Sequence, residues 1–181
     1  TGTGDVAISM AKKIPTSQIV GIDLSEEMLK VAQQKIERFS IKPNIRLLCE
    51  DAENLSLSSN TFDIITISFG IRNFENIVNG LSECHRILKE GGSLFIMEFS
   101  TPKHKVFNVL YRIYSKHILP LIGQVISNDD KAYKYLPESI VEFNREHEFT
   151  ELLLNNGFDS CISISLSNGI AHIYIGVKSK M

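Results

Sequence analysis

Hydrophobic and polar positions along the chain alternate between the spacing typical of helices and that typical of strands. After Ser25, for example, Met28, Leu29, Ala32 and Ile36 recur at helical spacing. The pattern predicts helices over 4–13, 26–36, 74–89 and 148–156, and strands over 18–23, 44–49, 61–68, 93–99, 158–165 and 169–177. Such alternation favours an α/β fold built around a mostly parallel sheet.

Two of these strands carry further information. The run 61–68 is almost continuously apolar, as in a parallel strand that is covered on both faces. No long crossover separates 158–165 from 169–177, so we expect the last two strands to be antiparallel.

Length and composition limit the class of protein. The 181 residues suit one domain over 1–181, and a hydrophobic content of 43% is enough for a substantial core. A net charge of −2 does not favour nucleic-acid binding. Cys49, Cys84 and Cys161 are widely separated, which is typical of reduced, buried thiols in an intracellular protein. We find no apolar run of 18 residues and no signal peptide.

A glycine-rich motif opens the chain. Gly2-Thr3-Gly4-Asp5-Val6-Ala7 fits the pattern G-x-G-x-x-G/A, which lets the backbone approach a ligand closely before a helix begins. Taken alone, the same glycines fit an ordinary turn equally well. Because a native chain would hardly start inside such a loop, we expect an upstream segment that includes the first strand of the sheet.

Two acidic positions follow the next two strands. Asp23 ends the strand 18–23 about 20 residues after Gly4, the spacing expected for a carboxylate that binds a ribose. The alternative is that Asp23 only caps the helix that starts at 24–27. Asp51 and Ala52 follow the strand 44–49, where an acid can accept a hydrogen bond from an adenine amino group and Ala52 leaves room for the ring. The alternative there is a solvated acidic loop.

The sequence resembles the ubiquinone/menaquinone biosynthesis C-methyltransferase family of the UbiE type over nearly its whole length. The resemblance rests on Asn60-Thr-Phe-Asp-Ile-Ile-Thr-Ile-Ser-Phe-Gly-Ile-Arg-Asn73, Met97-Glu-Phe-Ser100 and Ala132-Tyr-Lys-Tyr-Leu-Pro-Glu-Ser-Ile140. The turn Leu88-Lys-Glu-Gly-Gly-Ser-Leu94 also resembles the helix-to-strand turn of this class. The resemblance implies a Rossmann-like S-adenosylmethionine methyltransferase fold, a mostly parallel sheet with an antiparallel C-terminal strand.

Carried over residue by residue, the resemblance implies S-adenosylmethionine contacts at Thr3, Asp23, Asp51, Ala52 and Ser68, beside the motif glycines Gly2 and Gly4. It also implies a cofactor half over about 1–100, a substrate and lid segment over about 101–146, and a C-terminal helix and strands over 147–181. The sequence departs from the family around Phe143-Asn144 and at Tyr174-Ile-Gly176, which bears on substrate detail.

The implied reaction is methylation of a ring carbon on a polyprenylated quinol, either 2-methoxy-6-polyprenyl-1,4-benzoquinol or demethylmenaquinol. Arg72 is the candidate catalytic group because its fixed charge can stabilise a phenolate. Its alternative role is an ion pair with Glu75. Asn73 is a candidate substrate contact or the N-cap of the next helix, and Tyr133 and Tyr135 are candidates for the acceptor pocket.

The segment 103–126 indicates which partners to expect. Val106, Leu110, Ile113, Tyr114, His117 and Ile118 form a helical stripe with basic residues between them. This stripe fits a core-facing helix, or a lid that holds an isoprenoid tail and touches an anionic membrane. We therefore expect a cytoplasmic protein, or one peripheral to the inner membrane (on the matrix side in a mitochondrion). A homodimer and a quinone-synthesis complex are both compatible with the sequence.

Two other classes of function compete with this interpretation. A nicotinamide-dependent dehydrogenase shares the glycine loop but needs a hydride-transfer site, which the sequence does not offer. A non-catalytic methyltransferase-like scaffold in a quinone-synthesis complex is the second alternative. The five histidines have no metal-ligand spacing, and the proposed chemistry needs no metal.

Overall fold

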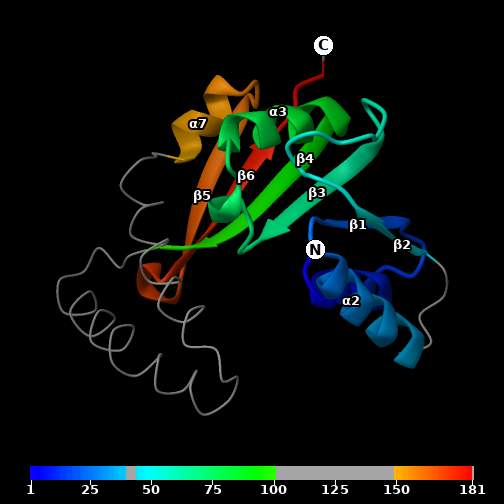
Figure 1. The fold of residues 1–181 in the computed structure, drawn as a ribbon. Helices are drawn as coiled ribbons and strands as arrows, with labels where there is room; N and C mark the ends of the chain where they lie inside the picture. Colours follow the sequence, from blue (N-terminus) through cyan, green and yellow to red (C-terminus); the bar gives the residue numbers. More distant parts are fainter. Residues whose placement is uncertain (40–43, 101–148, 181) are drawn as a thin grey trace. The chain divides into compact units, whose positions relative to one another are not determined.

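The computed structural model describes residues 1–39, 44–100 and 149–180, and it divides into two compact units, 1–58 and 59–181 (Figure 1). The interpretation of 1–181 as one domain with three segments stays a prediction. The described helices and strands match the predicted order, and the differences lie mostly at their ends.

The first unit is a β-α-β arrangement that follows a short helix. It contains α1 (Asp5–Lys13), β1 (Ile19–Asp23), α2 (Glu26–Arg38) and β2 (Ile45–Cys49). The strands β1 and β2 are parallel, with Ile19 opposite Ile45 and Asp23 opposite Cys49. Because parallel strands share their direction, the residues that follow β1 and β2 emerge at the same edge of this sheet.

Local sequence explains where α2 begins and which face it buries. Ser25 is the N-cap, and its hydroxyl accepts a hydrogen bond from the Met28 N–H at 3.4 Å. Leu29, Ala32 and Ile36 are buried, as their spacing predicts. Met28 was expected on the same face, but it is 46% exposed. One helical position is 100° of rotation, so Met28 lies at the edge of the apolar stripe.

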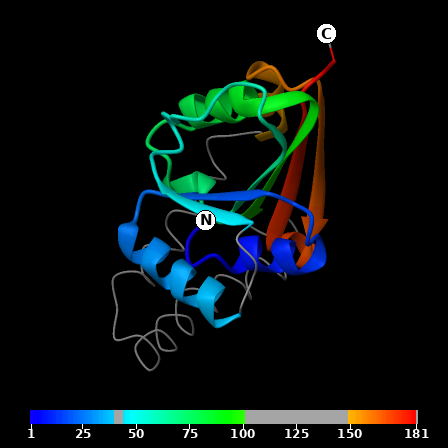
Figure 2. The ribbon, with the colours of Figure 1, turned by 90° about the vertical axis from the view of Figure 1, so that its right-hand side faces the viewer.

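The second unit is a four-stranded mixed sheet in the order β3 (Phe62–Ser68), β4 (Leu88–Phe99), β6 (Ala171–Val177) and β5 (Ser160–Leu166) (Figures 1 and 2). The first pair, β3 and β4, is parallel, whereas β6 is antiparallel to both of its neighbours. The structure thus confirms the predicted antiparallel C-terminal strands.

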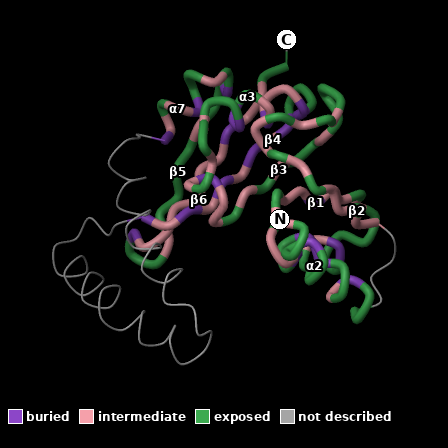
Figure 3. The backbone as a smooth tube through the Cα atoms, in the orientation of Figure 1, coloured by how far each residue is buried: buried purple, intermediate pink, exposed green. Residues whose placement is uncertain are grey.

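One face of this sheet carries the core of the second unit. Leu94 and Ile96 alternate with half-buried residues along β4 and are themselves fully buried. They pack with α3 (Ile77–Ile87) and α7 (Phe149–Asn155), whose buried residues are coloured purple in Figure 3. Each fully buried aliphatic side chain stabilises the fold by about 1.5–3 kcal/mol. Ile64 of β3 is 50% exposed, so the expectation that both faces of this strand are covered is wrong at that position.

The starts of α3 and β4 differ most from the prediction. The helix α3 begins at Ile77, because the side chain of Asn76 accepts the Asn79 N–H at 3.3 Å and forms the N-cap. Asn73, the predicted alternative cap, therefore does not cap this helix. The strand β4 begins at Leu88, which pairs with Phe62 across a register shift, and not at residue 93 after the paired glycines.

Lys178, which follows β6, connects three segments of the second unit. Its Nζ donates hydrogen bonds to Asn60 Oδ1 at 2.9 Å, to the His85 carbonyl at 2.8 Å and to the Leu88 carbonyl at 2.9 Å. An ammonium has three N–H donors, so each is used. The two carbonyls lie at the C-terminal end of α3, where carbonyls lack helical partners and favour a cation.

The cysteines have different surroundings. Cys84 is buried, and burial raises the pKa of its thiol to about 12. Cys161 is partly buried, whereas Cys49 is exposed, so the expectation of a buried thiol is wrong for Cys49.

None of the helices in the described ranges combines the length and apolar character that a membrane span requires.

Candidate active site

The glycine loop has the backbone conformation that its motif predicts. Gly2 and Gly4 have φ values of 56° and 78°, in the left-handed region that favours glycine. A Cβ on Gly4 would lie 2.9 Å from the Cβ of Ala32, so this glycine lets the loop approach α2 closely. A Cβ on Gly2 would meet no atom within 4 Å. Gly4 thus serves packing, whereas Gly2 borders open space.

Asp23 lies beside this loop and holds it. Its Oδ2 accepts the Gly2 N–H at 2.7 Å, and its Oδ1 accepts the Ser25 N–H at 2.9 Å. Burial raises the pKa of Asp23, but the hydrogen bonds that it accepts, first of all from the N–H groups of Ser25 and Gly2, hold the pKa below its usual value. Asp23 is therefore ionised at neutral pH. The alternative role, as cap of α2, belongs instead to Ser25.

The acidic pair after β2 lies at the same edge as Asp23. The Glu50 N–H donates to the Asp23 carbonyl at 3.3 Å. The Glu50 carboxylate accepts the hydroxyl and the N–H of Ser56 at 2.6 and 3.0 Å, and these bonds lower the pKa of Glu50. Asp51 is exposed and uses Oδ1 to accept the Glu53 N–H at 2.9 Å, while Ala52 is half-buried. Of the two carboxylates, that of Asp51 therefore accepts fewer hydrogen bonds from neighbouring residues.

Thr3 has a different set of contacts. Its hydroxyl donates to Asp5 Oδ2 at 2.8 Å and accepts from Lys35 Nζ at 2.8 Å. Lys35 also binds both oxygens of Asp5 at 2.9 Å, and these bonds lower the pKa of Asp5. The Thr3 hydroxyl thus fixes the start of α1 to α2. A cofactor contact by Thr3 stays a prediction. Because the hydroxyl of Thr3 is already hydrogen-bonded, its backbone is more available to a ligand than its side chain.

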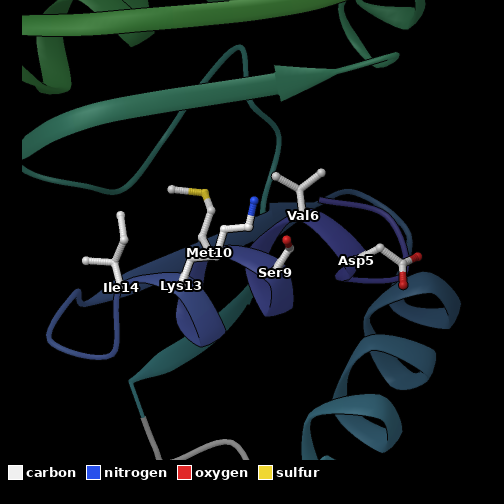
Figure 4. Close-up of a pocket in the computed structure, with 6 residues that line it drawn as sticks. All are labelled: Asp5, Val6, Ser9, Met10, Lys13 and Ile14. Atoms are coloured by element: carbon white, nitrogen blue, oxygen red, sulfur yellow. The ribbon is translucent and has the colours of Figure 1, made fainter.

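A hollow lies over α1, and Figure 4 shows the side chains that line it along this helix. Its lining consists of Asp5, Val6, Ser9, Met10, Lys13 and Ile14. The hollow contains none of Asp23, Asp51 and Ala52. The predicted ribose and adenine contacts, Asp23 and Asp51, follow β1 and β2 and are not among the residues that line this hollow.

In the second unit, the candidate residues follow the carboxyl end of β3. Ser68 is the last residue of that strand, is exposed, and lies opposite Met97 of β4. Phe69 then adopts a left-handed φ of 56°, which is rare for a bulky residue and occurs often at functional sites. Its ring stacks on Phe99 with centroids 4.3 Å apart. This turn sends the chain into a short helix over Ile71–Asn73.

Arg72 bridges the carboxyl ends of β3 and β4. Its Nη1 donates to the Phe69 carbonyl at 2.8 Å and to Glu98 Oε1 at 2.5 Å. The side chains of Arg72 and Glu98 are 10% and 0% exposed, so this ion pair is buried. The ion pair found for Arg72 is with Glu98 and not, as the alternative predicted, with Glu75. Ligands of α/β sheets bind outside the carboxyl ends of the strands, which is where Arg72 lies.

Glu98 is not among the site residues that the sequence predicts. The predicted Asn73 is exposed beside Arg72, whereas Tyr133, Tyr135 and the stripe over 106–118 lie outside the described residues. A signal for Glu98 was available, because it continues the two-residue alternation of the buried residues Leu94 and Ile96. An acid in the buried phase of a strand indicates a partner or a function.

The ends of β1 and β2 carry the groups that are predicted to hold an adenosine. The carboxylate of Asp23 has about four acceptor positions, and the two backbone donors that it binds leave one further position on each oxygen. The space beside Gly2 admits a ligand to the loop backbone, and Asp51 and Ala52 lie at the same edge. Within the described residues, no group of acidic, histidine or cysteine side chains is arranged to hold a metal ion.

Comparisons with known proteins give one consistent result. The sequence model of the ubiE/COQ5 methyltransferase family matches residues 1–178. The demethylmenaquinone methyltransferase of Porphyromonas gingivalis is 39% identical over 98% of this chain and 73% of its own length. The ubiquinone/menaquinone biosynthesis C-methyltransferase UbiE of Geotalea uraniireducens is 41% identical over 98% of this chain and 76% of its own. The crystal structure of a SAM-dependent methyltransferase from Aquifex aeolicus shares the fold, with a TM-score of 0.69 at 18% identity over 97% of this chain and 77% of that one.

Proposed function

Because this chain belongs to the ubiE/COQ5 methyltransferase family, we propose that it transfers the methyl group of S-adenosylmethionine to a ring carbon of a polyprenylated quinol. The chain is an S-adenosylmethionine-dependent methyltransferase of quinone biosynthesis. The acceptor is 2-methoxy-6-polyprenyl-1,4-benzoquinol or demethylmenaquinol. The observation that carries the proposal is the family match over residues 1–178.

We assign the adenosine of the donor to the edge where β1 and β2 end. Asp23 accepts hydrogen bonds from the ribose hydroxyls, for which its lowered pKa keeps it ionised. Asp51 accepts one from the adenine amino group, and Ala52 leaves room for the ring. Gly2, Thr3 and Gly4 present their backbone to the ligand. Ser68, the last residue of β3, is a separate proposed cofactor contact, which rests on the family resemblance alone. When bound, S-adenosylmethionine supplies an electrophilic methyl group.

We assign the acceptor to the surroundings of Arg72. The ring carbon becomes nucleophilic when the neighbouring phenol loses its proton, so a fixed positive charge near that oxygen favours the reactive form. A guanidinium remains charged at any physiological pH and offers planar donors. Asn73, Tyr133 and Tyr135 are the proposed contacts to the rest of the quinol. The protein also holds the carbon in line with the methyl group, which converts an encounter into an oriented reaction.

The two alternatives are weaker. A nicotinamide-dependent dehydrogenase is disfavoured because the family match covers residues 1–178 and is to methyltransferases. A methyl-transfer assay distinguishes a scaffold role from catalysis. Assembly into a homodimer or a larger quinone-synthesis complex is a separate question from catalysis. We further propose that the apolar stripe over 106–118 receives the isoprenoid tail at a membrane surface.

The experiment is a methyl-transfer assay with both quinols in reduced form. Purified protein is mixed with methyl-labelled S-adenosylmethionine and each acceptor, and the products are identified by mass spectrometry. The proposal expects one added methyl group on the ring carbon of at least one acceptor. Binding of S-adenosylmethionine without transfer to either quinol would favour the scaffold.

A further inference from the structure

Glu98 occupies a position that sequence patterns assign to an apolar residue. It follows Leu94 and Ile96 on the inner face of β4, and its side chain is 0% exposed. Burying a carboxylate carries a large desolvation cost, so such groups are paired. Its charged partner is Arg72, 26 positions earlier in the sequence. Because burying this acid at the end of a core strand is costly, its presence there needs a reason.

Stability alone does not supply that reason. Replacing a buried ion pair by apolar residues of similar volume is often neutral or stabilising. In addition, Glu98 Oε2 and Arg72 Nε are buried and have no hydrogen-bond partner among the described residues. An arrangement selected only for stability would leave neither group unsatisfied, because each such buried group is destabilising. The pair therefore serves the placement of one of its members.

The geometry shows which member is placed. The two N–H groups of Arg72 Nη1 bind the Phe69 carbonyl and Glu98 Oε1 from the ends of two different strands. The Phe99 N–H in turn donates to the same Oε1 at 2.9 Å and holds the carboxylate in place. Fixing both donors of one nitrogen fixes the plane of the guanidinium, and with it the direction of the remaining donors.

We infer that Glu98 is a positioning residue, which orients the Arg72 guanidinium at the carboxyl ends of β3 and β4 for its action on the quinol. The inference rests on the proposed function, in which Arg72 stabilises the phenolate. Because the side chain of Glu98 is fully buried, it does not contact a ligand and acts only through Arg72. Removing its charge leaves Arg72 in place but free to turn, and a displacement of about 1 Å near the reacting atoms can cost roughly a hundredfold in rate.

The test compares Glu98→Gln with Glu83→Gln. Gln keeps the shape of Glu but removes its charge. Glu83 forms a partly buried ion pair with Arg86 on α3, with two bonds of 2.7 Å, and so controls for the loss of an ion pair in the same unit. The inference expects Glu98→Gln to lower kcat roughly 10–100-fold, with unchanged affinity for S-adenosylmethionine in calorimetry. Glu83→Gln should leave kcat and that affinity within about twofold of the unmodified protein.

A double variant separates positioning from core damage. If Glu98 acts through Arg72, the variant Arg72→Gln with Glu98→Gln should have the same kcat as Arg72→Gln alone, and Glu98→Asp should recover part of the loss. This comparison remains informative if Glu98→Gln alone fails to fold, because the double variant removes both charges. A further tenfold loss in the double variant, or full kcat in Glu98→Gln, overturns the inference. Absence of methyl transfer by the unmodified protein would instead remove the proposed function itself.

Discussion

Replacing Asp23 by Ala is the most specific test of the proposed cofactor site. The carboxylate makes two backbone hydrogen bonds of 2.7 and 2.9 Å to Gly2 and Ser25, and its side chain is 23% exposed. The loss of one charged hydrogen bond to the ribose weakens binding by about 1.5–3 kcal/mol, which is roughly tenfold to more than a hundredfold in the dissociation constant.

The same substitution also lowers the stability of the fold by about 1–2 kcal/mol, discounted for the partial exposure of the carboxylate. Since the pKa of Asp23 is lowered by folding, this contribution is fully present above about pH 4 and is lost as the pH falls through the folded-state pKa. The difference in unfolding free energy between the two proteins should therefore shrink below about pH 4.

Calorimetry with S-adenosylmethionine measures the binding effect, and denaturant unfolding at pH 7 and pH 3 measures the stability effect. Asp63→Ala is the matched control, because Asp63 is 80% exposed and forms a surface ion pair with Lys89. We expect this control to change the stability by less than about 1 kcal/mol and the affinity not at all. A folded Asp23→Ala protein with unchanged affinity would refute the assignment of Asp23 to the ribose.

Further substitutions test other parts of the account. Arg72→Lys should lower kcat more than it weakens S-adenosylmethionine binding, because Lys keeps the charge and loses the planar fork; equal turnover would reduce Arg72 to a structural ion pair. Gly4→Ala should lower the unfolding free energy by about 2 kcal/mol through its φ of 78° and the 2.9 Å approach to Ala32. Gly2→Ala has the strain of a φ of 56° but no close contact, so it should lower the unfolding free energy by less, about 1 kcal/mol, and should also weaken cofactor binding; an equal loss of stability in the two variants would contradict this division. Lys178→Met should lower the unfolding free energy by about 2–4 kcal/mol, since it leaves two carbonyls and Asn60 without their donor; a loss below 1 kcal/mol would show that water replaces the ammonium.

The periodic parts of the sequence were sufficient to predict the element order. Short-range signals such as the capping hydroxyl of Ser25 and the spacing of Leu29, Ala32 and Ile36 act within one or two turns, so they are visible in sequence. The start of β4 was not, because Leu88 joins the strand only through a pairing with Phe62 across a bulge. The choice of Asn76 over Asn73 as cap also depends on where the chain leaves the turn after Phe69.

The candidate site shows the same division between local and long-range information. The glycine loop, Asp23 and Asp51 could be proposed from the sequence because each follows a predicted strand or opens a helix. The partner of Arg72 could not, because Glu98 is 26 positions away and reaches it only through the pairing of β3 with β4. Sequence proximity suggested Glu75 instead. Buried ion pairs across parallel strands are set by sheet register, which a single sequence does not specify.

The most direct test of the central claim is the transfer of labelled methyl from S-adenosylmethionine to a reduced quinol by the purified protein. The account predicts a product that is heavier by one methyl group on the ring carbon of demethylmenaquinol or of 2-methoxy-6-polyprenyl-1,4-benzoquinol. It also predicts that this product decreases in Asp23→Ala and in Arg72→Lys. Protein that binds S-adenosylmethionine but leaves both quinols unmethylated, or that methylates oxygen instead of carbon, would contradict it.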